Sequence, residues 1–139
     1  MYEKMIVAFD GSVPAARALQ HAIQLAQTVH AKLVTILHVN PNLPLGEPLL
    51  NIDLDSLVEE ENEALLMPAL RQLAHSGISY ESHSLDGDPA AVITTYADEH
   101  RADVILMGST GKSMIKEALL GSVSHEVAHT AHCPVIIVK

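Results

Sequence analysis

Five short, mostly apolar runs alternate along this chain with longer segments that have helical periodicity. Each run is too short for a helix, and strands that are apolar throughout are typical of a parallel sheet covered on both faces. The alternation of strand and helix therefore predicts an α/β fold with a parallel sheet. The predicted strands are residues 5–9, 33–39, 78–85, 103–108 and 134–138, of which the third is the least regular.

Four helices are expected between these strands. The first should begin at Ser12 as N-cap, with Pro14 in its first turn, where the missing N–H of proline costs nothing. A second is predicted over residues 53–75, kinked by Pro68 and ended by Gly77. Residues 86–89 should turn into a third helix that runs to His100, and residues 122–131 should form the last. Residues 40–51 carry three prolines and a glycine and are expected to form a surface loop.

We expect these elements to form one doubly wound five-stranded sheet in the order 3-2-1-4-5, with helices on both faces. In such sheets, ligands bind outside the carboxyl ends of the strands, at the point where the direction of winding reverses. Here that point lies between the first and fourth strands, which end at Asp10 and Gly108. These two residues mark the expected ligand site.

Length and charge narrow the possible partners. A chain of 139 residues suits one domain, residues 1–139. The 17 acidic residues exceed the 8 basic ones and give a formal net charge of -9, which disfavours binding to nucleic acid or to an anionic membrane. The first residues show no signal-peptide pattern, so a cytoplasmic protein is expected. Cys133 is the only cysteine and is expected to be a buried structural thiol.

A glycine-rich segment follows the fourth predicted strand. Glycines allow positive φ and close approach of the backbone to a ligand, so successive N–H groups can converge on an anion. Gly121-Ser122 opens a helix, where free N–H groups and the positive end of the dipole favour phosphate. A tight connection between strand and helix could use the same glycines, and the loop alone leaves both readings open. Further polar groups nearby are the hydroxyls of Ser109, Thr110, Ser122 and Ser124 and the amines of Lys112 and Lys116.

The spacing Gly108, Gly111, nine residues, then Gly121-Ser122 resembles the nucleotide signature of the universal stress protein family. The likeness extends from residues 6–12 to residues 133–138. It implies a Rossmann-like, adenine nucleotide alpha hydrolase-like fold that binds ATP, ADP or AMP, with Mg²⁺ as a possible companion. Asp10 and the backbone at Val39 would hold the nucleoside, and the glycine loop would hold the phosphates. The full set of implied site residues is Ala8, Phe9, Asp10, Val39, Met107, Gly108, Thr110, Gly111, Gly121, Ser122, Val123 and Ser124.

Asp10 has two interpretations on its local sequence. An aspartate before Gly-Ser often shapes a turn by accepting backbone N–H bonds. A bare carboxylate repels phosphate, so if Asp10 meets the ligand, it should meet ribose hydroxyls, the adenine amino group or a metal ion. Both interpretations stay open.

A second motif points to a different chemistry. Residues 125–129 have the HExxH spacing of zinc peptidases, in which both histidines bind the metal and the glutamate activates water. The expected helix has its apolar stripe on the opposite side, which places the histidines, with His132, on the solvated face. A zinc-dependent hydrolase is therefore a remote alternative, and incidental metal binding is left open. The apolar stripe consists of Val123, Val127 and Ala131.

The sequence thus favours a nucleotide-binding regulatory protein of the stress response. No catalytic residue and no resident metal ligand is assigned, and a slow metal-dependent ATP hydrolase of the same fold is the alternative. The predicted strand at 134–138 is apolar and outermost, and exposed apolar edges invite pairing with another chain. We therefore expect a homodimer through this strand. The protein that acts downstream is not identified by the sequence.

Overall fold

The computed structural model describes residues 1–41, 54–111 and 120–139, and most of the predicted loop at 40–51, with Lys112 and Lys116, lies outside these ranges. Within them the strands form one five-stranded sheet in the order β3-β2-β1-β4-β5, with every neighbouring pair parallel. The fold predicted from the strand and helix pattern is therefore confirmed. The strands are β1 (Lys4–Ala8), β2 (Leu33–Asn40), β3 (Tyr80–Asp86), β4 (Val104–Gly108) and β5 (Val135–Val138).

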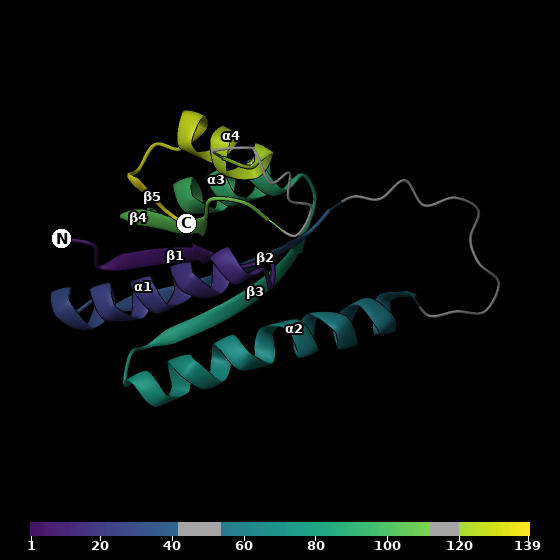
Figure 1. The fold of residues 1–139 in the computed structure, drawn as a ribbon, viewed down its shortest axis with the longest axis horizontal. Helices are drawn as coiled ribbons and strands as arrows, with labels where there is room; N and C mark the ends of the chain where they lie inside the picture. Colours follow the sequence, from purple (N-terminus) through teal and green to yellow (C-terminus); the bar gives the residue numbers. More distant parts are fainter. Residues whose placement is uncertain (42–53, 112–119) are drawn as a thin grey trace.

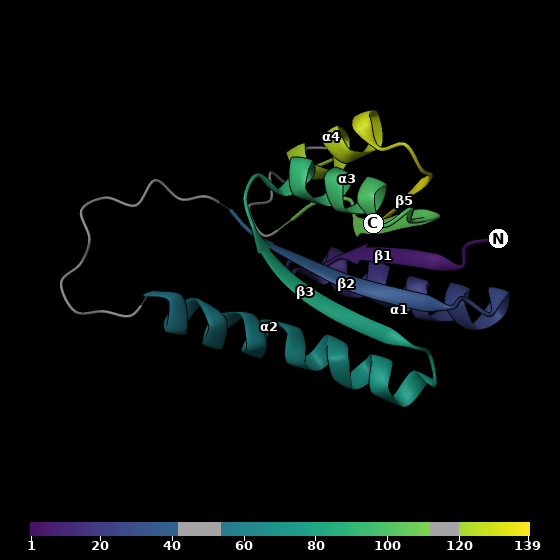
Figure 2. The same cartoon turned by 180° about the vertical axis from the view of Figure 1, so that it is seen from behind.

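Helices cover both faces of the sheet (Figures 1 and 2). α1 and α2 lie on one face, whereas α3 and α4 lie on the other. Alternate residues of β1 point to opposite faces: Met5 and Val7 join the core under α1 and α2, and Ile6 and Ala8 join the core under α3 and α4. The helices are α1 (Val13–Val29), α2 (Leu54–Ser76), α3 (Pro89–Glu99) and α4 (Ser122–Thr130).

The predicted ends of the helices mostly agree with the structure. The Ser12 hydroxyl caps α1 by accepting the Ala15 N–H at 3.2 Å. Gly77 follows α2 with φ +77 and no atom within 4 Å of a Cβ added there, so its backbone conformation alone requires glycine. α2 continues through Pro68, and the kink there stays a prediction. None of the helices in the described ranges is both long and apolar enough to cross a membrane.

Cys133 and the third strand differ from expectation. Cys133 is only partly buried, at the rim of the core under α3 and α4. Burial nevertheless raises the pKa of its thiol, and the charges of Asp98 and Asp103 raise it further. The third strand starts two residues later than predicted, at Tyr80, because β3 is an edge strand with a mostly polar sequence, which blurs its apolar pattern.

Candidate functional site

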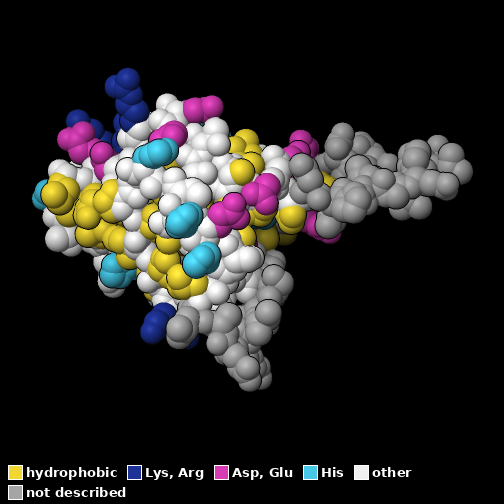
Figure 3. All heavy atoms as spheres, turned by 90° about the horizontal axis from the view of Figure 1, so that it is seen from above, with side chains coloured by type: hydrophobic (Ala, Val, Ile, Leu, Met, Phe, Trp, Pro, Cys, Tyr) yellow, Lys and Arg dark blue, Asp and Glu magenta, His cyan; other side chains and the backbone are white. Residues whose placement is uncertain are grey.

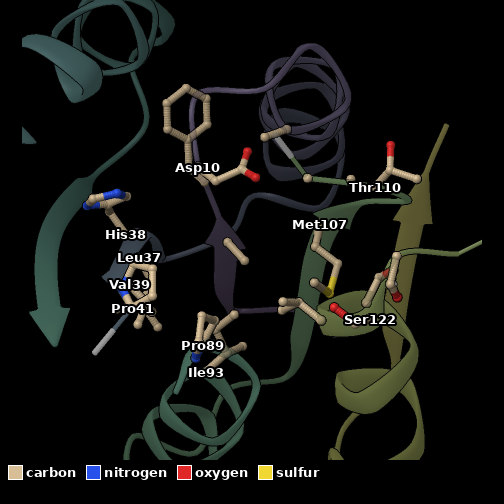
Figure 4. A pocket seen from close by; sticks show the side chains of 18 of the residues that line it. Asp10, Leu37, His38, Val39, Pro41, Pro89, Ile93, Met107, Thr110 and Ser122 are labelled. Carbon is tan, nitrogen blue, oxygen red and sulfur yellow. Dashed lines mark hydrogen bonds between the residues drawn. The ribbon is translucent and has the colours of Figure 1, made fainter. Parts of the chain in front are cut away.

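A cavity of about 490 Å³ opens at the carboxyl ends of β1, β2 and β4, at the predicted switch point (Figure 4). Its walls come from the ends of these strands, from residues that follow them and from all four helices α1 to α4. All the site residues inferred from the sequence line this one cavity. They are Ala8, Phe9, Asp10, Val39, Met107, Gly108, Thr110, Gly111, Gly121, Ser122, Val123 and Ser124.

The first turn of α4 contributes backbone donors to this cavity. Its N-cap is Gly121, which has no side chain that could accept an N–H bond, and the first intrahelical bond runs from the His125 N–H to the Gly121 carbonyl at 3.0 Å. The N–H groups of Ser122, Val123 and Ser124 precede that bond. An uncapped helix start with converging N–H groups and a positive dipole end is suited to an anion such as phosphate.

One carbonyl fixes the entry to α4. The Ser109 carbonyl accepts the Gly121 N–H at 2.6 Å and the Ser124 hydroxyl at 2.8 Å, and Ser124 also reaches the Gly121 carbonyl at 3.1 Å. The Ser124 side chain is 3% exposed and bonded to protein, so it positions the turn instead of offering a free hydroxyl. Thr110 and Ser122 also line the cavity and carry hydroxyl groups (Figure 4).

The loop glycines serve close packing, and the expectation of positive φ is wrong for them. Gly121 has φ -72, and neither Gly108 nor Gly111 adopts positive φ. A Cβ at Gly108 would lie 2.6 Å from the Cβ of Pro14 and 2.8 Å from the Ala15 nitrogen, so β4 must end in glycine to meet α1. At Gly111 it would lie 2.7 Å from the Asp10 Oδ2. Gly108 therefore lets β4 approach the first turn of α1, and Gly111 leaves room for the Asp10 carboxylate at the cavity wall.

The structure confirms the turn interpretation of Asp10, and its contact with a ligand stays a prediction. Its Oδ1 accepts the Ser12 N–H at 2.9 Å, which makes the turn between β1 and α1, with Gly11 at φ 81. The other carboxylate oxygen lies toward Gly111 at the cavity wall (Figure 4). One oxygen thus holds the turn, and the other lies beside Gly111 at the cavity wall.

The backbone of Val39 faces the space beyond the end of β1. Successive residues of a parallel strand direct their polar groups alternately to the two neighbouring strands. The Leu37 carbonyl accepts the Phe9 N–H at 2.9 Å on the β1 side, and the Asn40 carbonyl accepts the Gly87 N–H at 2.9 Å on the β3 side. Val39 is two residues after Leu37, past the last β1–β2 pair at Ala8 and Leu37, so its N–H and C=O lie on the β1 side of β2, where Val39 lines the cavity.

The comparison with known proteins agrees with this geometry. The universal stress protein family matches residues 1–139. The chain belongs to the universal stress protein family. Universal stress protein YxiE of Bacillus subtilis is 37% identical, with 100% of both chains covered. The solved structure of MJ0577 of Methanocaldococcus jannaschii is 31% identical, with a TM-score of 0.90, and covers 100% of this chain and 96% of its own.

Two further solved structures of this family are complexes with adenine nucleotides. One universal stress protein was crystallised with cAMP; it is 27% identical, with a TM-score of 0.76, over 99% of this chain and 97% of its own. A universal stress protein from Archaeoglobus fulgidus was solved with dAMP; it is 26% identical, with a TM-score of 0.72, over 99% of this chain and 98% of its own. Proteins of this family therefore bind adenine nucleotides.

Several wall residues of this universal stress protein carry no motif and were missed by sequence reasoning. His38 is 7% exposed at the cavity wall, and apolar side chains from α2 and α3 also line the cavity. The predicted winding already brings the start of α3 to the carboxyl edge of the sheet, so Pro89 could have been found from it. Leu65 depends on how far α2 reaches across the sheet, which no local pattern shows. The missed residues are Ala15, Leu37, His38, Pro41, Leu65, Pro89, Ile93 and Leu120.

The HExxH motif lies away from the cavity. His125, Glu126 and His129 are exposed on α4, whereas Val127 is fully buried beneath them, as the apolar stripe predicted. Within the described residues, no three His, Cys, Asp or Glu side chains come together as metal ligands. A zinc peptidase needs three protein ligands and an activated water, so this helix does not supply that centre within the described ranges.

Tyr96, whose phenol has a raised pKa, also lies away from the cavity. Burial raises the pKa of the Tyr96 phenol, and the neighbouring Glu81 charge and hydrogen bond raise it further. The Glu81 Oε1 accepts from the Thr35 hydroxyl at 3.2 Å and from the Tyr96 hydroxyl at 3.5 Å. Tyr96 therefore belongs to a network that joins α3 to β2 and β3, not to the candidate site.

Proposed function

We propose that this universal stress protein binds an adenine nucleotide, such as ATP, in the cavity at the carboxyl edge of its sheet and acts as a cytoplasmic regulator of the stress response. The observation that carries the proposal is the arrangement of two backbone sites on opposite sides of one cavity (Figure 4). Val39 offers an N–H and a C=O at one side. The uncapped first turn of α4 offers N–H groups at the other.

The Val39 backbone suits adenine better than guanine. Adenine carries an amino donor at position 6, whereas guanine carries a carbonyl acceptor there. A C=O that accepts from the adenine amino group would face the guanine carbonyl and leave two acceptors opposed. The apolar wall formed by Ile93, Pro89 and Leu65 suits the flat base. The cAMP and dAMP complexes of relatives support an adenine ligand.

The phosphates are proposed to lie against Gly111, Thr110 and the start of α4. None of the described wall residues is Lys or Arg, so backbone N–H groups and hydroxyls are the donors that these ranges supply. Mg²⁺ takes oxygen ligands, often one or two carboxylates with substrate phosphates. The second oxygen of Asp10 fits this donor set, so Asp10 would hold the ion and the ion would neutralise part of the phosphate charge.

Binding without rapid turnover is the proposed activity. Hydrolysis needs a group that orients or deprotonates the attacking water. The titratable side chains of the described wall are Asp10 and His38, of which Asp10 holds the β1–α1 turn and His38 lies in β2 at the nucleoside end. Phosphate release, followed with and without Mg²⁺, is expected to stay far below about 1 per second, a rate at the low end for dedicated enzymes.

Competition between nucleotides tests the proposal. In isothermal titration, GTP should bind at least about 10-fold more weakly than ATP, because the loss of a paired hydrogen bond in a buried site costs more than about 1 kcal/mol. Native mass spectrometry of gently purified protein should show an adenine nucleotide. Equal affinity for ATP and GTP would overturn the Val39 assignment, and no binding of either would overturn the function.

We also propose that two copies pair through β5. Every residue of β5 is partly exposed, and β4 is its hydrogen-bonded neighbour in a sheet where β5 is an outer strand. Antiparallel pairing of two copies would satisfy the outer backbone groups in one self-complementary contact. The Pro134 and Val138 carbonyls accept the Ile105 and Ser109 N–H groups, so the alternate residues Val135 and Ile137 direct their backbone groups outward. Ile137→Pro removes an outer donor and should yield monomers by sedimentation, whereas Ile137→Val should stay dimeric. A wild-type monomer at micromolar concentration would refute this arrangement.

A further inference from the structure

The two histidines of the HExxH motif have no role in the cavity, yet the structure places them as a pair. His125 and His129 are both exposed and four residues apart on α4. Residues at this spacing lie on the same side of a helix, with Cβ atoms about 5–6 Å apart. Among the described residues, neither imidazole takes part in a hydrogen bond, ion pair or ring contact, in contrast to His132, whose Nε2 lies 3.5 Å from the Asp98 Oδ2. Both imidazoles are therefore available to a ligand from solvent.

We propose that His125 and His129 form a two-ligand site for a late first-row divalent ion, Cu²⁺, Ni²⁺ or Zn²⁺, on the exposed face of α4. Neutral imidazole is a preferred ligand of these ions, and their affinity for nitrogen sites follows the order Zn²⁺ or Ni²⁺ below Cu²⁺. Because the described side chains offer no cluster of three ligands, the remaining coordination positions belong to water. The site thus holds its ion through two protein ligands and exchanges it with solvent, unlike a structural zinc centre, which uses four protein ligands.

The position of the pair along α4 favours a cation. His129 lies in the last turn of the helix, where the carbonyl ends of the dipole attract positive charge, and Glu126 adds a carboxylate on the same exposed side of the chain. The opposite end of α4 faces the cavity and favours an anion. One nine-residue helix would then carry an anion site at its start and a cation site near its end.

Figure 3 shows the surface formed by α3 and α4, on which histidine side chains are prominent. On this surface, the requirement for i and i+4 spacing separates the proposed pair from the other exposed histidines. On the opposite face of the molecule, His21 on α1 and His75 on α2 are exposed as single imidazoles, with the His75 Nδ1 2.7 Å from the Arg71 carbonyl oxygen, and they provide a control that removes the same number of histidines. The proposal rests on spacing, so a test must change spacing while keeping the number of histidines.

The experiment is a titration of the full, tag-free chain with CuCl₂, NiCl₂ and ZnCl₂ by calorimetry. The wild-type protein should bind one ion of each, most tightly Cu²⁺. His125→Gln with His129→Gln should weaken binding at least about 10-fold, since even the loss of a partner outside the ligand shell costs about 10–100-fold in metal affinity. His21→Gln with His75→Gln, which also removes two exposed imidazoles, should bind as the wild type does.

A variant with altered spacing distinguishes binding by the His125–His129 pair from binding that depends only on the number of exposed histidines. His129→Gln with Thr130→His keeps the histidine count but moves one imidazole off the shared face, and it should bind as weakly as the double glutamine variant. Wild-type affinity in this variant, no binding to the wild-type chain, or equal loss in the control pair would each overturn the proposal. All variants should bind ATP as the wild type does, so failure of this site is distinguishable from failure of the nucleotide site.

Discussion

Among the helices whose starts the structure describes in full, α1, α3 and α4 begin at the carboxyl edge of the sheet, but they begin in two different ways. α1 and α3 close their first turns with their own side chains: Ser12 accepts the Ala15 N–H at 3.2 Å, and Asp88 accepts the Ala91 N–H at 3.1 Å. α4 starts at Gly121, which has no side chain to do so, although its first turn lines the cavity as Ala15 of α1 and Pro89 of α3 do. A helix start is therefore a candidate binding group when its own side chains do not cap it and a ligand can reach it.

The largest effect should come from closing the open start of α4 with a charge. Ser122→Asp places a carboxylate where the phosphates are proposed to lie, and like charges about 4 Å apart repel by roughly 4 kcal/mol at an effective dielectric of about 20. Calorimetry should show ATP affinity reduced about 100-fold or more. The fold should remain intact, because an acidic residue in the first turn of a helix is stabilising.

Ser122→Asn is the matched control for this change. The amide has nearly the same shape as the carboxylate but no charge, so ATP affinity should fall far less than in Ser122→Asp. If both variants bound ATP with wild-type affinity, phosphates would not lie at the start of α4.

A second pair of variants compares two glycines, one packed against the first turn of α1 and the other at the N-cap of α4. Gly108→Ala should lower the free energy of unfolding by about 2–3 kcal/mol, because overpacking against the first turn of α1 forces the backbone to move. Gly121→Ala should cost about 1 kcal/mol or less, since its nearest neighbour would be the Thr110 Cα at 3.3 Å. Urea unfolding measures both. Equal costs would mean that the start of α1 is not packed as tightly on β4 as the structure shows.

The smallest effect should come from removing a cap that already exists. Asp88→Ala should reduce the free energy of unfolding by about 1 kcal/mol, because the Ala91 N–H loses its acceptor. Thermal unfolding should show the loss, and Asp88→Ser should restore most of it. ATP affinity should change little in either variant, and a large loss of affinity would show that capped helix starts also contribute to the site.

Most of this fold could be predicted from the sequence because the patterns that mark its helices and strands are local. Ser12, Pro14 and Gly77 mark helix ends through their own backbone preferences, and the apolar runs mark buried strands. The site could be predicted because the glycine spacing resembles that of the universal stress protein family and because the strand order brings the ends of β1 and β4 together. Leu65 and His38 could not be predicted as wall residues, because their place in the wall follows from packing between distant segments. The sequence also did not show why position 108 requires glycine, since only the structure shows Pro14 packed against it.

Amide chemical shifts report most directly on the central claim that the uncapped start of α4 and the Val39 backbone hold an adenine nucleotide. In a ¹H–¹⁵N titration with ATP, the largest shifts should occur at the amides of Ser122, Val123 and Val39, and the capped amides of Ala15 and Ala91 should stay near their starting positions. Adenosine should shift Val39 but leave Ser122 and Val123 almost unchanged, because it lacks the phosphates. Saturable ATP binding that leaves Ser122 and Val123 unshifted, or that shifts Ala15 and Ala91 equally, would contradict the account.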